Sequence, residues 1–400
     1  MFNDLSLLAD DPILGLMALY AKDSNPNKVD LGVGVYKNNE GEVVIMESVR
    51  AAERSYLDEQ ITKSYQGITG DGEFTAAIEK LIYGCDHSII HSGRMHTLQT
   101  PGSCGGLFLA AQLLKAANPK ATLWVSNPTW GNHYTIFEAA GITVRAYPYY
   151  DNTTRAINFS AMQEHLQAEA KAGDTVLLHG CCHNPSGADL TLEQWQAIAT
   201  LLKDKHLTPL VDQAYQGYGQ GLREDSLGIA HLANELPEML VSYSCSKNFS
   251  LYRERTGALS VIAETPQQAS AALSHLKHAA RASYSMPPGW GANLVKRVLS
   301  SPELGQQWAI ELDGMRQRIA DMRGLLAEKL KQQAASFDAN YLSQQRGMFS
   351  FLPLNTQQID TLREQHGVYI VANGRLSFTG LSSHNIDYAA KAIADVSKQA

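Results

Sequence analysis

Four apolar runs of strand length recur in the middle of the chain, and each ends in a polar or glycine-containing break. They read TLWVSNPTWGNHY, TVLLHGCCHNPSG, LTPLVDQAYQG and MLVSYSCSKN, beginning at Thr122, Thr175, Leu207 and Met239. Helical patterns lie between them, which is the rhythm of βα units. Because the runs are too apolar for strands with one face in water, they predict an α/β fold with a mixed, mostly parallel sheet covered on both faces. Ligands of such sheets collect at the carboxyl ends of the strands, so the chemistry is expected there.

Helical patterns extend this prediction to domains. CGGLFLAAQLLKAAN starts at Cys104 and stops before Pro119, and LTLEQWQAIATLLKDKH starts at Leu190 with Thr191 as its expected N-cap. A long charged helix follows from Glu303, and the tail mixes the strand-like MFSFLPL and VYIVANGRLSFTG with the helical DYAAKAIADVSKQ. We predict an N-terminal arm with part of a small domain over 1–44, a large domain over 45–314 and a small α+β domain over 315–400.

Length, composition and net charge limit the kinds of function that this chain can have. The chain has 400 residues, enough for two or three domains of about 150 residues each. Charged residues make up 18%, below the usual share of about 25%, which indicates a large interior or a buried subunit interface. The net charge of -7 gives no basic face for phosphates, so nucleic acid is not an expected partner.

Cysteine usage and the lack of an export pattern or a long apolar run bear on the cellular compartment of the protein. Five cysteines are an odd number, and adjacent Cys181 and Cys182 cannot easily bridge each other, so we expect reduced thiols. The start MFNDLSLLADDP lacks an export pattern, and no run approaches 18 apolar residues. We therefore expect a cytoplasmic protein with no membrane partner.

SYSCSKNFSLYRERTGA contains a lysine and an arginine just past an apolar run. Lys247, among small uncharged neighbours, could lose its proton and form a Schiff base, and Arg255 offers a fork for phosphate. Asp212 ends another run, where a buried carboxylate is costly unless it meets a cation such as a protonated pyridine nitrogen. Spacing alone leaves the ordinary interpretations open, namely a surface Lys and Arg and a helix-capping Asp.

Three further motifs are weak one at a time. Asn184 in HNPSG could donate to a phenolate oxygen, although Asn before Pro is usually turn chemistry. TPGSCGG over 100–106 could bind an anion at a helix N-terminus, or be a plain loop. Trp130 and His133 could be core aromatics, or a stacking platform with a supporting partner.

Together these motifs resemble the fold-type I, class I aspartate and aromatic aminotransferases, which use pyridoxal 5′-phosphate (PLP). The resemblance runs through LGVGVYKNNEG, KSYQGITG, TPGSCGG, NPTWGNHY, HNPSG, DQAYQG, SCSKNFSLYRERTGA, RASYSMPP and ANGRLSFTG, and so covers nearly the whole chain. It implies a large domain with a seven-stranded-type sheet between helices, a small α+β domain, PLP as cofactor, no metal and a homodimer with shared active sites.

Site roles follow from the resemblance position by position. It implies that Lys247 binds the cofactor and is catalytic, with Asp212 on the pyridine nitrogen and Tyr65 reaching the phosphate from the neighbouring subunit. Substrate contacts would come from Gly34, Trp130, Asn184, Arg281 and Arg375, with Arg375 on the α-carboxylate and Arg281 of the neighbour on a distal carboxylate. The remaining cofactor contacts would be Gly102, Ser103, Cys104, Ser244 and Arg255 at the phosphate, Asn184 and Tyr215 at the ring oxygen, and Trp130 and Ala214 on the ring faces.

The implied chemistry is coherent. Asp212 would keep the ring nitrogen protonated, so that the ring accepts the electrons released when the substrate Cα proton leaves, and Lys247 would carry that proton to the C4′ carbon. Hydrolysis then frees a 2-oxo acid and leaves the aminated cofactor, which a second oxo acid reverses in a ping-pong cycle.

Departures from the aspartate pattern bear on substrate choice. Ser64, Cys104 and Met286 stand where that branch typically has Asn, Thr and Asn, and they make the side-chain pocket less polar. We therefore favour transfer between aromatic amino acids (tyrosine, phenylalanine or tryptophan), or aspartate, and 2-oxoglutarate, with Arg281 turning outward for an aromatic ring. Lys37 remains as in the aspartate branch, so an aspartate aminotransferase with little aromatic activity is the alternative.

Two other interpretations use the same fold. A β-lyase or decarboxylase is one, but Arg281 together with Arg375 suits two-carboxylate substrates and favours transamination. A ligand-sensing regulator is the other. Such a protein would be expected to carry a DNA-binding extension before LGVGVYK, but this motif begins at residue 31 and is expected to leave no room for one.

Overall fold

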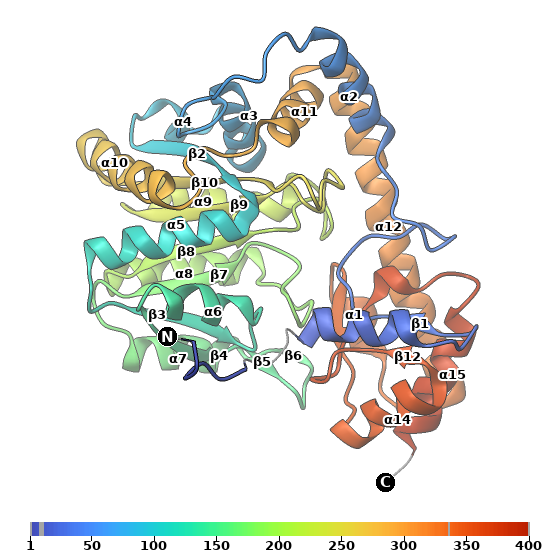
Figure 1. The fold of residues 1–400 in the computed structure, drawn as a ribbon. Helices are drawn as coiled ribbons and strands as arrows, with labels where there is room; N and C mark the ends of the chain where they lie inside the picture. Colours follow the sequence, from blue (N-terminus) through green and yellow to red (C-terminus); the bar gives the residue numbers. More distant parts are fainter. Residues whose placement is uncertain (1, 8–11, 335–336, 399–400) are drawn as a thin grey trace. The chain divides into compact units, whose positions relative to one another are not determined.

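The computed structural model describes residues 2–7, 12–334 and 337–398 (Figure 1). The chain divides into two compact units. The larger comprises Val44–Arg318 and Gln345–Gly347, and the smaller Met1–Val43, Ile319–Gln344 and Met348–Ala400. The chain therefore divides at 43/44 and 318/319, whereas the predicted boundaries are at 44/45 and 314/315, and the domain assignment stays a prediction.

A seven-stranded sheet forms the centre of the larger unit, in the order β2–β10–β9–β8–β7–β3–β4 (Figure 1). β10 runs antiparallel to both neighbours, and the other pairs are parallel. The predicted apolar runs are β3, β7, β8 and β9, so the α/β fold with a mostly parallel sheet is confirmed. The strands are β2 (Met95–Pro101), β3 (Thr122–Asn127), β4 (Thr143–Pro148), β7 (Thr175–His179), β8 (Thr208–Gln213), β9 (Met239–Ser244) and β10 (Thr256–Ile262), with a separate pair β5 (Tyr150–Asp151) and β6 (Ala156–Ile157).

Local sequence explains where the helices of this unit begin. Thr191 caps α8 through a reciprocal capping box with Gln194, as expected, and α5 begins two residues before the expected Cys104. The helices are α2 (Glu47–Glu59), α3 (Gly72–Tyr83), α4 (Ser88–His91), α5 (Gly102–Ala117), α6 (Asn132–Ala139), α7 (Phe159–Glu169), α8 (Leu192–Asp204), α9 (Leu227–Glu235), α10 (Pro266–Ser283) and α11 (Gly289–Ser300), with a 3-10 turn η1 (Glu224–Ser226).

One apolar core fixes the sheet beneath the strand ends. Helix α5 packs against β2, β9 and β10, and α10 packs against α5. Six neighbouring strands each contribute one buried leucine, namely Leu98, Leu123, Leu177, Leu210, Leu240 and Leu259. Because such an interior is close-packed, polar groups at the strand ends are held on a rigid support.

The smaller unit is a mixture of helices and short strands. β1 pairs in parallel with β12, and β11 pairs antiparallel with β13. Its elements are α1 (Pro12–Lys22), β1 (Val29–Asp30), α13 (Asn340–Gln344), β11 (Phe349–Phe351), α14 (Thr356–His366), β12 (Val368–Tyr369), β13 (Arg375–Ser377), η2 (Phe378–Gly380) and α15 (Ile386–Ser397), and α12 (Pro302–Gln333) passes from the larger unit into this one. No helix in the described part of the chain is long and apolar enough to span a bilayer.

Candidate active site

The larger unit brings the predicted cofactor groups together at the carboxyl ends of β7, β8 and β9. Asp212 in β8 lies opposite His179 of β7 and Ser242 of β9. Lys247 follows β9 after Ser244, and its Nζ lies 4.8 Å from the centre of the Tyr215 ring. The parallel register therefore gathers side chains that are far apart in the sequence.

Lys247 lies in surroundings that favour its neutral amine. Burial lowers the pKa of Lys247, and the nearby Arg255 charge acts in the same direction. Asp212 and Cys104 oppose this effect, but the pKa of the lysine stays below its ordinary value. A neutral amine is the form that can accept a proton or attack a carbonyl carbon.

The N-terminus of α5 lies against the Arg255 guanidinium. Gly102 has a left-handed φ of +68°, and a Cβ there would lie 2.7 Å from Nη2 of Arg255. Nη1 of the same guanidinium donates to the Tyr252 carbonyl at 2.9 Å and to Ser246 Oγ at 3.3 Å. A helix N-terminus next to a fixed arginine suits an anion such as a phosphate.

Cys104 lies close to the same charges. Burial raises the pKa of its thiol, although Arg255 and Lys247 act to lower it. The thiol is therefore neutral at pH 7 and makes this turn less polar than a hydroxyl would.

Asp212 is buried and ionised. Its Oδ2 lies 3.2 Å from Nε2 of His133. Burial alone would raise the pKa of Asp212, but the hydrogen bond and charge of His133, with smaller effects of His179 and Lys247, leave it below the ordinary value. The carboxylate therefore keeps its negative charge at neutral pH.

A chain of hydrogen bonds continues behind His133. Thr129 Oγ1 lies 2.8 Å from Nδ1 of His133 and 3.1 Å from Nε2 of His179. Burial, with the neighbouring His133, lowers the pKa of His179 to about 3, so His179 is neutral. When neutral His133 donates from Nε2 to Asp212, Thr129 must donate to its Nδ1 and accept from His179, so each donor points toward the carboxylate.

His183 extends this buried group with a fixed tautomer. Ser126 Oγ donates to the Pro128 carbonyl at 2.8 Å and therefore accepts from Nε2 of His183 at 2.9 Å. Nδ1 of His183 then accepts from Ser186 Oγ at 2.8 Å. Burial holds the pKa of His183 well below its ordinary value, which agrees with a neutral ring.

The loop that carries Asn184 is tied down by a carboxylate. Asp189 accepts the backbone N–H groups of Cys182 at 2.7 Å and His183 at 2.8 Å. Burial raises the pKa of Asp189 to about 6. The predicted ring-oxygen ligand Asn184 therefore lies, largely buried, on a loop held from both its backbone and the His183 side chain.

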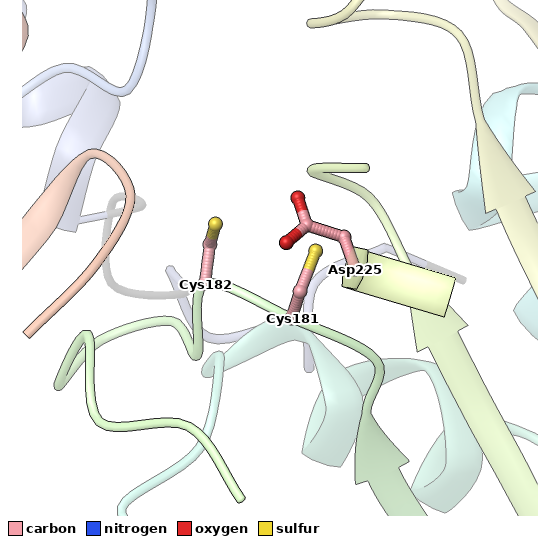
Figure 2. A group of neighbouring side chains, drawn as sticks. All are labelled: Cys181, Cys182 and Asp225. Carbon is pink, nitrogen blue, oxygen red and sulfur yellow. The ribbon is translucent and has the colours of Figure 1, made fainter. Parts of the chain in front are cut away.

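Figure 2 shows Cys181, Cys182 and Asp225, whose ligand atoms all lie within 4.8 Å of one another. Burial raises the pKa of both Cys181 and Asp225, so the thiol stays protonated. The Asp225 oxygens already accept backbone N–H groups of Gly217, Gly219 and Gln220 at 2.7 to 2.9 Å. The carboxylate thus organises a loop, and the prediction of no metal stays a prediction.

Two features of this cluster, at Asp212 and at Gly102, bear on whether PLP fits it. Oδ1 of Asp212 is buried and has no hydrogen-bond partner among the described residues, as expected of an oxygen that awaits a donor such as a pyridinium N–H. The Gly102 turn has no room for a Cβ beside Arg255, which suits close approach of a phosphate. These residues fit the group.

The other predicted residues fall into two groups, those that lie apart from this cluster and two, Trp130 and Ala214, that lie beside it. Tyr65 is 92% exposed, and Arg281 on α10 is exposed and bonds Ser285. Gly34 and Arg375 belong to the smaller unit. Trp130 stacks edge-on against His133 at 5.3 Å, and Ala214 is buried directly after Asp212 and Gln213. The assignment of all these side chains as site residues stays a prediction.

Sequence reasoning missed Thr129, His179 and the bonds that fix His183. His179 ends the apolar run of β7 just as Asp212 nearly ends β8, and that equivalence was a usable signal once parallel strands were expected. The link through Thr129 has no sequence signal, because it depends on how the turn after β3 folds back.

The model of the family described as aminotransferase class I and II matches residues 26–393. The chain belongs to this family. It is 44% identical to an aspartate aminotransferase of Salmonella typhi and 42% identical to an aromatic-amino-acid aminotransferase of Paracoccus denitrificans, each over 99% of this chain and 100% of the relative. The crystal structure of the Burkholderia pseudomallei aromatic-amino-acid aminotransferase, covalently bound to PLP, superposes with a TM-score of 0.96 at 41% identity over 99% of both chains.

The family confirms several predictions. The resemblance, the fold-type I architecture, transaminase chemistry and PLP as cofactor are all supported by the matched family and the similar structures. Relatives named for aspartate and for aromatic amino acids have nearly the same identity to this chain, so overall identity does not separate the two substrate classes.

Proposed function

We propose that this aminotransferase moves the amino group between aromatic amino acids (tyrosine, phenylalanine or tryptophan), or aspartate, and 2-oxoglutarate. The observation that carries the chemistry is the buried Asp212 carboxylate, bonded by His133 on Oδ2 and open on Oδ1, close enough to Lys247 for the two charges to interact. A similar structure, the aromatic amino acid aminotransferase of Psychrobacter sp. B6, was cocrystallised with aspartic acid, and so supports dual substrate use (TM-score 0.97, 38% identity, both chains fully covered).

Different residues of this chain would hold each part of PLP. Asp212 would bind the ring nitrogen, Asn184 and Tyr215 the ring oxygen, and Trp130 and Ala214 the two ring faces. When bound, the protonated ring supplies a sink for the electron pair released at the substrate Cα. The phosphate would be held by Gly102, Ser103, Cys104, Ser244 and Arg255, with Tyr65 of a second copy.

Lys247 would move the proton. Its lowered pKa makes the neutral amine available, so Nζ could take the proton from the substrate Cα and deliver it to the C4′ carbon of the cofactor. Asp212 would stay ionised, because the hydrogen bond and charge of His133 hold its pKa below the ordinary value.

The substrate ends would be bound by arginines. Arg375 with Gly34 would take the α-carboxylate, and Arg281 of a second copy the distal carboxylate. Ser64, Cys104 and Met286 make the surroundings less polar, which favours an aromatic ring, whereas Lys37, paired with Asp30 at 3.0 Å, is the feature that keeps the aspartate alternative open.

A homodimer is part of this proposal. Ile61 and Tyr65 are 97% and 92% exposed, and Leu57 on α2 is 67% exposed. Large apolar side chains gathered at the surface are typical of a contact with another chain, here a second copy that would receive Tyr65.

The proposal also places the enzyme in the cytoplasm. No disulfide joins the five cysteines, all of which lie in the described part of the chain, and those at positions 181, 182 and 245 are buried, which suits a reducing compartment.

The test is a comparison of kcat/KM for tyrosine, phenylalanine and aspartate with 2-oxoglutarate as acceptor. We expect turnover of all three, together with a change in cofactor absorbance when the amino acid alone is added to the PLP-loaded enzyme, and its reversal when 2-oxoglutarate follows. Turnover of aspartate only would establish the aspartate alternative, and release of pyruvate or carbon dioxide without amino transfer would establish a lyase or decarboxylase.

A further inference from the structure

Gly34 and Arg375 meet at one aromatic ring within the smaller unit. A Cβ on Gly34 would lie 2.4 Å from Cζ of Phe349, so the backbone at this position lies directly against the ring tip. The guanidinium carbon of Arg375 lies 4.4 Å from the centre of the same ring. Phe349 is 2% exposed, so its ring is fixed by its surroundings.

Strand register puts the arginine and the ring on one face. Arg375 in β13 lies opposite Phe351 in β11, and Phe349 is two residues further along the same strand. Because alternate residues of a strand share a face, Phe349 and Phe351 flank the arginine on its own side.

A backbone carbonyl fixes the guanidinium at its edge. Nη2 of Arg375 donates to the Gly32 oxygen at 2.6 Å, two residues before Gly34. A guanidinium that stacks on an aromatic face keeps its N–H groups in plane, where they can bind a carboxylate. Ring and carbonyl together hold the group before substrate arrives, which reduces the ordering cost of binding.

We propose that Phe349 is a positioning residue, which orients Arg375 by its ring face and Gly34 by its ring edge for the substrate α-carboxylate. The inference rests on the proposed function, because it takes Arg375 as the ligand of that carboxylate. It adds a residue that touches no reacting atom yet sets carboxylate affinity.

The test variant is Phe349→Met, which keeps an apolar side chain of similar size but removes the π face. Phe378→Met is the matched control, because Phe378 is also buried in the smaller unit with the guanidinium carbon of Arg323 4.1 Å from its ring centre. Phe349→Tyr is unsuitable, since the added hydroxyl would meet Gly34.

Two readouts separate positioning from general packing. Calorimetry of the PLP-loaded enzyme gives the affinities for 3-phenylpropionate and for its neutral analogue 3-phenylpropan-1-ol. We expect Phe349→Met to weaken the carboxylate about tenfold and to leave the alcohol unchanged, with KM raised about tenfold for both amino acid and oxo acid and kcat changed less than about threefold. Phe378→Met should leave both affinities at the wild-type values.

Equal weakening by both variants, or unchanged carboxylate affinity in Phe349→Met, would overturn the inference. If Phe349→Met does not fold, Phe349→Leu removes the same ring face and must show the same selective loss for the carboxylate. A wild type that binds 3-phenylpropionate but transfers no amino group would instead contradict the proposed function, and the binding comparison would still decide the role of Phe349.

Discussion

Nε2 of His133 lies 3.2 Å from Oδ2 of Asp212, and both side chains are buried. The other carboxylate oxygen has no partner among the described residues. The two oxygens therefore have different roles. One is held by the protein, and the other is available to a ligand. This division keeps Asp212 ionised and anchored through Oδ2, while Oδ1 can accept a ring N–H.

Asp212→Asn should lower kcat by about 10² to 10⁴-fold and weaken retention of PLP, because a neutral amide no longer favours a protonated ring nitrogen. The matched control is Asp174→Asn, another buried carboxylate, which accepts from Trp124 Nε1 at 3.0 Å just before β7 and far along the strand from Asp212. The measurements are kcat and PLP content after dialysis. Equal losses in both variants would show that Asp212 acts only through packing.

Lys247→Ala should still bind PLP through the phosphate turn and the Asp212 carboxylate, but turnover should fall at least 10² to 10⁴-fold, because the positioned proton carrier is gone. Cofactor content and turnover are measured on the same preparation. Lys205→Ala, at the end of α8, is the control and should behave as wild type. Substantial transamination by a fully loaded Lys247→Ala enzyme would assign the proton transfer to another group.

Much of the fold could be predicted because the local sequence of β3, β7, β8 and β9 is strongly apolar. Asp212 and Lys247 could be placed at strand ends for the same reason. The strands β2 and β10 carry no comparable signal, since polar or small residues interrupt the apolar residues of both MHTLQTP and TGALSVI.

The part of the site that could not be predicted from the sequence depends on tertiary contacts. Which histidine meets Asp212 depends on the register of β8 with β7 and on the turn after β3, and neither can be read from spacing. The role of Phe349 was equally hidden, because a phenylalanine in MFSFLPL looks like any core residue until Arg375 and Gly34 are placed around it.

Acid should destabilise the protein through its buried neutral histidines. The pKa of His179 is about 3 in the folded chain, and about 6.5 is the ordinary value expected when unfolded. Above pH 6.5 both states are neutral and the residue has no effect. Between pH 6.5 and 3 only the unfolded chain takes the proton, so stability falls as pH falls, by about 2 kcal/mol at pH 5.

Urea unfolding at pH 7 and pH 5, with excess PLP, measures this loss. His179→Gln keeps a donor for Thr129 but cannot titrate, so the difference between its two midpoints should be smaller than in the wild type. The exposed His206→Gln should keep the wild-type difference. An unchanged pH dependence in His179→Gln would mean that other groups cause the acid sensitivity.

Hybrid dimers test whether the site is shared between subunits. An inactive Lys247→Ala chain mixed with an Arg281→Ala chain should recover aspartate activity, because one of the two sites then has an intact lysine and an intact neighbouring arginine. Recovery to about a quarter of wild-type activity is expected for random mixing. No recovery in dimers verified as hybrid would place Lys247 and Arg281 in a site within one chain.

Arg281→Ala tests dual specificity. Loss of one partner of a charge-assisted pair costs about 2 to 5 kcal/mol, so kcat/KM for aspartate should fall by more than about thirtyfold. Phenylalanine never forms that pair, and Ser64, Cys104 and Met286 leave its pocket weakly polar, so its kcat/KM should stay within about tenfold of wild type.

The deciding measurement is the ratio of kcat/KM for phenylalanine to that for aspartate, in wild type, in Arg281→Ala and in the exposed control Arg145→Ala. The ratio should rise only in Arg281→Ala, because only this variant removes the ligand of the distal carboxylate. A constant ratio would show that Arg281 does not distinguish the substrates. A wild type that barely accepts phenylalanine would make the chain an aspartate enzyme, in which the substitutions at positions 64, 104 and 286 carry no change of specificity.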